Sequence, residues 1–130
     1  MKFIETSLSD SWLIIPELHA DSRGFFARSC CGHEFADHGL WHEWVQFNLS
    51  YNECKGTLRG LHFSLLTVHE VKLVRCTAGA IFDVIVDIRP ESPSFGRWFG
   101  TQLTAENRNA LYIPMGFAHG FQTLTDRSEV

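Results

Sequence analysis

AIFDVIVDI, residues 80–88, decides the fold, because it alternates like a strand with two different faces. Successive side chains of a strand point to opposite sides of the sheet. Here one side carries Phe82, Val84, Val86 and Ile88, and the other carries Ile81, Asp83, Ile85 and Asp87. Asp83 and Asp87 therefore interrupt the apolar face of a strand that looks central. An acid on an inner face needs a partner, because a buried charge without one is costly.

Similar strand-like runs, separated by turn residues, occur along most of the chain. Besides residues 80–88, we expect strands at Trp12–Leu18, Trp44–Tyr51, Thr57–Phe63, Val71–Cys76, Trp98–Thr104, Ala110–Pro114 and Ala118–Leu124. Turns are expected at residues 78–79, 89–93 and 106–109. Only His33–Gly39 is typical of a short helix with a glycine stop. The pattern predicts an all-β fold, most simply a jelly roll.

Composition limits the class of protein. A chain of 130 residues predicts one domain spanning residues 1–130. A net charge of −4 without a Lys/Arg run argues against nucleic-acid binding but leaves an anionic small ligand open. The start, MKFIETSLSD, resembles neither a signal peptide nor a membrane span, so a cytoplasmic location is expected.

The four cysteines form no C-x-x-C pair and are expected to be reduced thiols. Of the 11 Phe and 4 Trp, we expect Phe25, Phe26 and Trp98 to be core residues.

Two histidines lie in strand contexts that suit a site. His119 ends a P-x-G-x-x-H pattern that begins at Pro114, which is the second half of a cupin signature. The first half normally supplies H-x-H and a glutamate to a metal, but here it is His62-Phe63-Ser64, with His69 and Glu70 further on. Serine is a poor replacement for the second imidazole, so no metal cofactor is expected. The alternative is that both histidines are hydrogen-bonded core residues.

Three cations, Arg23, Arg59 and Lys72, also lie in strands or at strand edges. Arginine suits bidentate contacts to phosphate, and lysine can polarise an oxygen. The alternative for each is an ion pair with a nearby carboxylate: Asp21, Asp83 or Glu70.

Six segments together resemble one enzyme family over nearly the whole chain. They are DSRGFF (21–26), VQFNLS (45–50), GTLRGLHF (56–63), KLVRCTAGAIFDVIVDIRPESPSFGRW (72–98), LTAENR (103–108) and LYIPMGFAHGF (111–121). The chain is similar to the dTDP-4-dehydrorhamnose 3,5-epimerase family. The resemblance implies a metal-free cupin-type jelly roll (a double-stranded β-helix) that forms a homodimer. It implies a dTDP-4-keto-6-deoxyglucose-type substrate and a role in dTDP-L-rhamnose synthesis.

The same resemblance implies residue roles. His62 would be the base that removes protons beside the ketone, and Lys72 would stabilise the enolate oxygen. Arg59 would contact the nucleotide diphosphate, and His119 would lie beside the ketosugar. Four residues would help to hold the nucleotide, some of them across the dimer interface: Arg23, Phe26, Gln46 and Asn48. Asp83 is expected to be a structural partner.

The chain also departs from the family pattern. The family's tyrosine acid and the aspartate that orients its base histidine both correspond to positions beyond Val130, so we expect the family's C-terminal strands to be missing. Tyr51 and Tyr112 do not match the tyrosine's motif. Arg28 stands where many members carry glutamate, and residues 64–71 replace the usual loop. Two other functions stay open: a nucleotide-sugar-binding cupin with little or no activity, and a related dTDP-sugar ketoisomerase, whose strand normally carries two close histidines.

Overall fold

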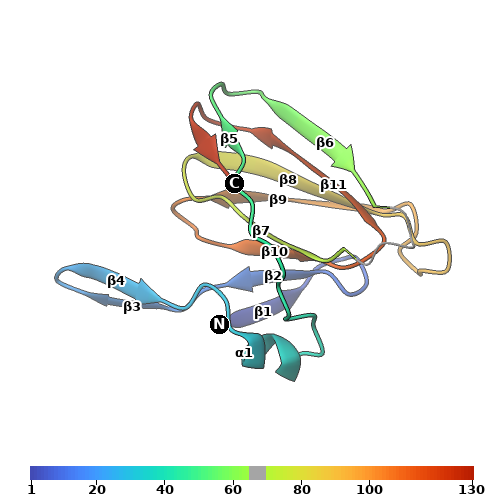
Figure 1. The fold of residues 1–130 in the computed structure, drawn as a ribbon, viewed down its shortest axis with the longest axis horizontal. Coiled ribbons are helices and arrows are strands. Elements are labelled where there is room, and N and C mark those ends of the chain that lie inside the picture. The colour runs from blue at the N-terminus through green and yellow to red at the C-terminus, as the bar shows by residue number, and fades with distance from the viewer. Residues whose placement is uncertain (65–69) are drawn as a thin grey trace.

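The computed structural model describes residues 1–64 and 70–130, and its main body is two antiparallel sheets stacked in layers (Figure 1). The first sheet has the order β1 (Lys2–Glu5), β2 (Trp12–Ile15), β10 (Ala110–Ile113), β7 (Lys72–Arg75). The second has the order β6 (Leu58–His62), β11 (Phe117–Thr123), β8 (Ala80–Asp87), β9 (Trp98–Thr104). Strands distant in sequence are neighbours in both sheets, which confirms the expected all-β jelly roll.

The core lies between the two sheets. It consists mainly of side chains from β8, β9, β10 and β11: Ile81, Ile85, Leu103, Leu111, Ile113, Phe117 and Phe121, joined by Leu8 and Cys76. The alternation along β8 is confirmed, since Ile81, Asp83 and Ile85 are fully buried while Phe82 on the other face is 36% exposed. The inner face of β8 therefore does carry acids into the core.

The outer face of the first sheet is covered by α1 (Gly32–Asp37). Phe35 is fully buried there and packs against Tyr112 and Ile14. The helix ends at Asp37, two residues before the expected end at Gly39, whose φ of +68° lies in the left-handed region that glycine tolerates best. The N–H of Leu40 then bonds back to the carbonyl of Phe35 at 2.9 Å.

A hairpin of β3 (Leu18–Asp21) and β4 (Gly24–Ala27) projects from the body at the left of Figure 1. The strand expected over Trp12–Leu18 divides at Pro16, because proline has no N–H for a ladder bond. Phe25 and Phe26, expected in the core, are 46% and 75% exposed because the hairpin packs so little against the sheets. Trp98 is also exposed, so that expectation was wrong for all three aromatic residues.

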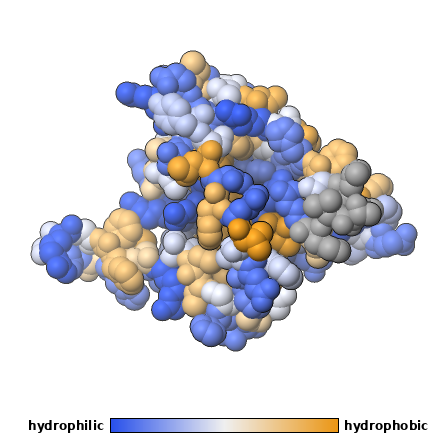
Figure 2. Space-filling model, viewed as in Figure 1, coloured by the Kyte–Doolittle hydropathy of each residue, from blue (hydrophilic) through white to orange (hydrophobic). Residues whose placement is uncertain are grey.

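The expected strand over Trp44–Tyr51 is mostly wrong. Only β5 (Tyr51–Asn52) forms a ladder, with β12 (Ser128–Glu129), because the residues before it have no neighbouring strand among the described parts of the chain. Val45, Phe47 and Leu49 consequently remain 94%, 86% and 77% exposed. We call these three side chains the apolar strip. Hydrophobic side chains gather over the hairpin and over the middle of this face in Figure 2.

Two further features concern the environment of the chain. All four cysteines are free, as expected, and only Cys76 is buried. Among residues 1–64 and 70–130, no helix has both the length and the apolar character that crossing a bilayer requires.

Candidate active site

A bulge in β6 brings Arg59 and His62 to the same face of the second sheet. Residues three apart in a regular strand would point to opposite faces. On β11, however, His119 is the partner of His62 and Phe121 is the partner of Arg59, so two residues of β6 lie opposite Gly120 alone. Directly paired residues share a face, and His119 and Phe121 are two apart. Arg59, His62 and His119 therefore lie on one face.

Gly60 makes this close approach possible. A Cβ at Gly60 would lie 2.6 Å from the carbonyl oxygen of His119 and 2.7 Å from the Cα of Gly120, both backbone atoms. The φ of Gly60 is +96°, which side chains rarely adopt. The glycine between Arg59 and Leu61 is thus required by contact with β11.

His119 is held by Asp83 inside the molecule. Its Nε2 lies 2.8 Å from Asp83 Oδ1, and the His119 side chain is only 12% exposed while that of Asp83 is fully buried. Burial raises the pKa of Asp83, and the hydrogen bond from His119 offsets part of that rise. Asp83 is therefore the hydrogen-bond partner of His119, a contact that is compatible both with a site residue and with a core histidine.

Lys72 enters the site from the other sheet. It pairs with Ile113 of β10, which belongs to the core between the sheets, so Lys72 shares the inward face. Its Nζ lies 3.5 Å from Glu70 Oε2, and the Ser64 hydroxyl donates to the same carboxylate. The hydrogen bond from Ser64 and the charges of Lys72 and His119 together lower the pKa of Glu70.

Arg59 is held through its Nε by the side chain of Asn52, at 2.6 Å from Oδ1. Its Nη2 lies 3.5 Å from the carbonyl oxygen of Tyr51. Among the described residues, no carboxylate forms an ion pair with Arg59. Of the three cations, Arg59 is the one to which the ion-pair alternative does not apply.

The other four expected binding residues do not join this group within one chain. Arg23 and Phe26 lie on the projecting hairpin, where Arg23 pairs with Asp21 at 2.6 Å and lowers the pKa of that carboxylate. Gln46 and Asn48 are exposed in the segment before β5, where they alternate with the apolar strip.

Possible metal ligands and the two tyrosines add no further residue to this group. Within residues 1–64 and 70–130, no three His, Cys, Asp or Glu side chains are grouped as metal ligands would be, and His69 lies outside these residues. The Tyr112 hydroxyl accepts a hydrogen bond from the N–H of Trp41 on the outer face under α1. Tyr51 is 53% exposed on β5.

Asp87, the second acid on the inner face of β8, belongs to a separate network. Arg89 Nη2 lies 2.8 Å from its Oδ2, and the hydroxyls of Ser92 and Ser94 donate to the same oxygen. Burial alone would raise the pKa of Asp87, but these hydrogen bonds hold it well below its ordinary value. The network ties the turn after β8 to the N-terminal loop, because Arg89 also pairs with Asp10.

Sequence reasoning missed two residues of the site. It treated Glu70 only as an ion-pair partner or a metal ligand, and it did not consider Asn52. Asn52 lies one residue beyond the expected strand Trp44–Tyr51, and the sequence around it did not indicate a contact with Arg59.

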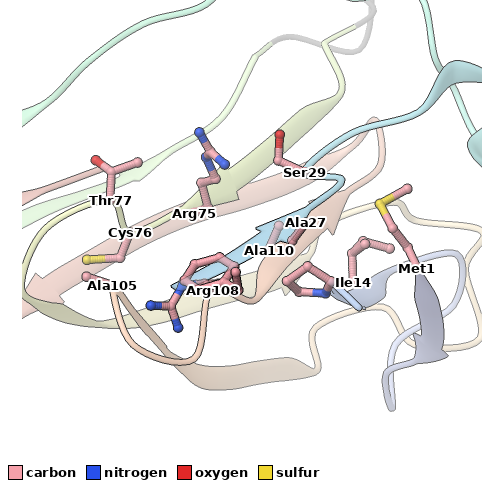
Figure 3. A pocket seen from close by; sticks show the side chains of 12 residues that line it. Met1, Ile14, Ala27, Ser29, Arg75, Cys76, Thr77, Ala105, Arg108 and Ala110 are labelled. Atoms are coloured by element: carbon pink, nitrogen blue, oxygen red, sulfur yellow. The ribbon is translucent and has the colours of Figure 1, made fainter. Parts of the chain in front are cut away.

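Two hollows of the surface lie away from this group. A pocket of about 260 Å³ under the β3–β4 hairpin is lined by Ile14, Ala27, Arg75, Cys76 and Arg108, among others (Figure 3). The guanidinium groups of Arg75 and Arg108 point in different directions in this view, so they do not converge on one ligand. A more open groove of about 760 Å³ runs between the N-terminal loop, His38 and Pro114. Neither contains His62, Lys72 or His119.

Comparison with known proteins identifies consistent relatives. The family model for dTDP-4-dehydrorhamnose 3,5-epimerase matches residues 5–130. The chain is 47% identical over 130 residues to the Shigella flexneri protein of that name, which covers 99% of this chain and 71% of the relative. The Escherichia coli K12 protein of the same name is 47% identical over 131 residues, and the match covers 99% of this chain and 70% of that protein.

Solved structures of related enzymes share the fold. The Bacillus anthracis dTDP-4-dehydrorhamnose 3,5-epimerase, determined with TDP and PPi bound, superposes with a TM-score of 0.90 at 43% identity, over 98% of this chain and 73% of that one. The Legionella pneumophila enzyme in complex with dTDP-4-keto-L-rhamnose superposes with a TM-score of 0.90 at 40% identity, over 98% of this chain and 68% of that one. The expected resemblance and the cupin-type fold are both confirmed.

Proposed function

The chain belongs to the dTDP-4-dehydrorhamnose 3,5-epimerase family, and on that premise we propose that it epimerises a dTDP-4-keto-6-deoxyhexose at C3 and C5 for dTDP-L-rhamnose synthesis. The single observation that carries this proposal for the chain's own residues is the bulge at Gly60, which sets His62, Arg59 and His119 on one face. Lys72 lies on the inward face of the opposite sheet.

The arrangement suits proton abstraction next to a ketone. The imidazole of His62 can act as the general base that takes the proton from a carbon beside the carbonyl. Negative charge then develops on the carbonyl oxygen, where the Lys72 ammonium stabilises it. His119, held by Asp83, would contact the sugar, and Arg59 would bind the diphosphate through charge-assisted hydrogen bonds.

A second copy of the chain would complete the nucleotide-binding site. The hairpin residues Arg23 and Phe26 project from the body and do not reach the site of their own chain, although the family resemblance gives them binding roles. The apolar strip, beside Gln46 and Asn48, is exposed and would be buried in a homodimer. We also place the protein in the cytoplasm, a location that the free cysteines support.

The roles are separated by comparing binding with exchange. In heavy water with dTDP-4-keto-6-deoxyglucose, His62→Ala should lose deuterium uptake beside the ketone by about 10²–10⁴-fold and keep its affinity for dTDP. Arg59→Ala should weaken dTDP binding, whereas Lys72→Ala should keep that affinity and slow exchange. NMR follows exchange and calorimetry follows binding. Undiminished exchange in His62→Ala removes it as the base, and dTDP binding without any exchange in the unmodified protein favours a binding role instead.

The dimer is tested by mixing subunits. A Phe26→Ala subunit keeps His62, and a His62→Ala subunit keeps the hairpin, so a mixed dimer has one complete site if the hairpin acts in the partner. Activity of the mixture above that of both parents supports the arrangement. A monomer in light scattering, or no recovery from dimers shown to exchange subunits, contradicts it.

A further inference from the structure

Asn52 is buried, with 2% of its surface exposed, and both polar atoms of its side chain form hydrogen bonds. Its Oδ1 accepts from Arg59 Nε at 2.6 Å. Its Nδ2 donates to the carbonyl oxygens of Ser50 and Ser128, at 3.0 and 3.2 Å. Because guanidinium groups only donate and carbonyl oxygens only accept, these partners fix which way the amide faces.

Asn52 is also fixed by its backbone. It pairs with Ser128 in the β5–β12 ladder, and Ser50 bonds to Val130 in both directions, at 2.9 and 3.0 Å. The Oδ1 that holds Arg59 is therefore attached to a rigid part of the fold, while Arg59 itself comes from β6, the edge of a different sheet. The bond determines where the long arginine side chain points, because Nε lies at the base of the guanidinium.

The bond to Asn52 differs from the contacts of three other arginines. Arg23, Arg28 and Arg89 each form an ion pair with at least one carboxylate. Arg59 is held by a neutral amide, which orients the guanidinium without compensating its positive charge. An oriented but uncompensated cation is what binding a diphosphate requires, since an ion-paired carboxylate would compete with the phosphate oxygens.

We propose that Asn52 is a positioning residue that directs Arg59 toward the diphosphate of the nucleotide sugar. This inference rests on the proposed function, because it assigns Arg59 the diphosphate. Asn52 itself would not contact the substrate. Its contribution would appear only in the binding of ligands that carry the diphosphate, and only while Arg59 is present.

The test is a double-mutant cycle on dTDP affinity, measured by calorimetry on the unmodified chain, Asn52→Ala, Arg59→Ala and the double variant. Asn52→Ala should weaken dTDP binding on the order of tenfold, as expected for losing one hydrogen bond to a charged group. In the Arg59→Ala background the same substitution should cause no further loss. In turnover, Asn52→Ala should raise KM and leave kcat within about twofold, because the contact is made equally in ground and transition states.

Asn107→Ala is the matched control. Asn107 also uses its amide for local bonds, with Nδ2 donating to the Gln102 carbonyl at 3.0 Å and Oδ1 accepting from the Thr104 N–H at 3.1 Å. It lies in the turn after β9, so its loss should lower stability and leave dTDP affinity unchanged. Asn52→Ser covers the case in which Asn52→Ala does not fold. The serine hydroxyl can donate to a neighbouring carbonyl oxygen, but the side chain is one bond shorter and cannot take the place of Oδ1 beside Arg59 Nε, so dTDP affinity should again fall.

The outcomes separate the two proposals. If the unmodified chain does not bind dTDP, or Arg59→Ala binds it as tightly, the proposed diphosphate role of Arg59 fails. If Arg59→Ala weakens binding as expected, the positioning role is overturned by any of three results. These are undiminished affinity in a folded Asn52→Ala, losses that add in the double variant, or undiminished affinity in Asn52→Ser.

Discussion

Removing the imidazole that holds Asp83 should produce a pH-dependent loss of stability. In His119→Leu, the substitution roughly preserves volume but takes away the 2.8 Å bond to Asp83 Oδ1. The other oxygen, Oδ2, already has no hydrogen-bond partner among the described residues. The variant would therefore contain a fully buried carboxylate without a partner on either oxygen.

The expected magnitude follows from that burial. Leaving a buried carboxylate without its partner costs about 3–5 kcal/mol of unfolding free energy at neutral pH. This is a large part of the roughly 5–15 kcal/mol that stabilises a typical domain. The cost should depend on pH, because burial raises the folded-state pKa of Asp83 and the variant loses the hydrogen bond that offsets the rise.

The sign follows from linkage. A carboxyl whose folded pKa lies above its unfolded value can fold protonated at low pH without penalty. Stability is then lost as the pH rises from the unfolded value of about 3.9 through the raised folded value. His119→Leu should consequently approach the unmodified protein in stability near pH 4 and fall away from it toward pH 7.

Urea unfolding followed by tryptophan fluorescence between pH 4 and pH 8 measures this. The matched control is His119→Leu combined with Asp83→Asn, which also lacks the imidazole but carries no buried charge. Relative to His119→Leu, the combined variant should be more stable at pH 7 and should lose the difference near pH 4. A gap between the two that does not change with pH, or is below about 1 kcal/mol at pH 7, would refute the account of Asp83 as a buried charge.

Three other predictions follow from the same structure. Asp87→Asn should make the stability of the protein less sensitive to acid, as measured by urea unfolding at pH 2–5. Hydrogen bonds hold the folded-state pKa of Asp87 below its ordinary value, so the stability that Asp87 contributes is present above about pH 4 and is lost as the pH falls further. Gly60→Ala should greatly lower the yield of folded protein, because its Cβ would overlap the β11 backbone, whereas Gly56→Ala, with a φ of +83° but open space, should cost only roughly 1–2 kcal/mol in thermal or urea unfolding. Elemental analysis should find no stoichiometric metal and EDTA should leave epimerase activity unchanged, since Ser64 bonds to Glu70 at the place of a second cupin ligand; one metal per chain with activity lost in EDTA would contradict this.

The strands that the sequence predicted well are those whose partners lie in the same chain. β8 alternates regularly between buried and more exposed residues, because the other sheet covers one of its sides, so the pattern along this strand directly reflects its packing. β9 begins and ends at the predicted residues, Trp98 and Thr104. The acids on β8 could be located on the inner face for the same reason, although their partners, His119 and Arg89, could not be assigned from the alternation.

Two of the failures depend on something outside the strand itself. Val45, Phe47 and Leu49 alternate with polar residues as a strand would, yet no described strand of this chain lies beside them. The position of Arg59 relative to His62 depends on the bulge opposite Gly120, and the register of β11 cannot be read from β6. The family resemblance implied the roles of Arg59 and His62, but only the structure shows that the two side chains lie on the same face of the sheet.

The cations show why an ion pair does not by itself decide between a structural and a functional role. Lys72 pairs with Glu70, as the alternative interpretation of this cation predicted. The two side chains are 27% and 39% exposed and 3.5 Å apart, and partly exposed pairs of this kind contribute only about 0–1 kcal/mol. Stabilising an enolate oxygen in a site that a bound sugar has cleared of water is worth several times that, since losing one oxyanion donor costs about 2.7–4 kcal/mol in other enzymes. In the role proposed for Lys72, the pair with Glu70 would therefore hold the side chain in place before substrate binds and still release its charge to the developing oxyanion.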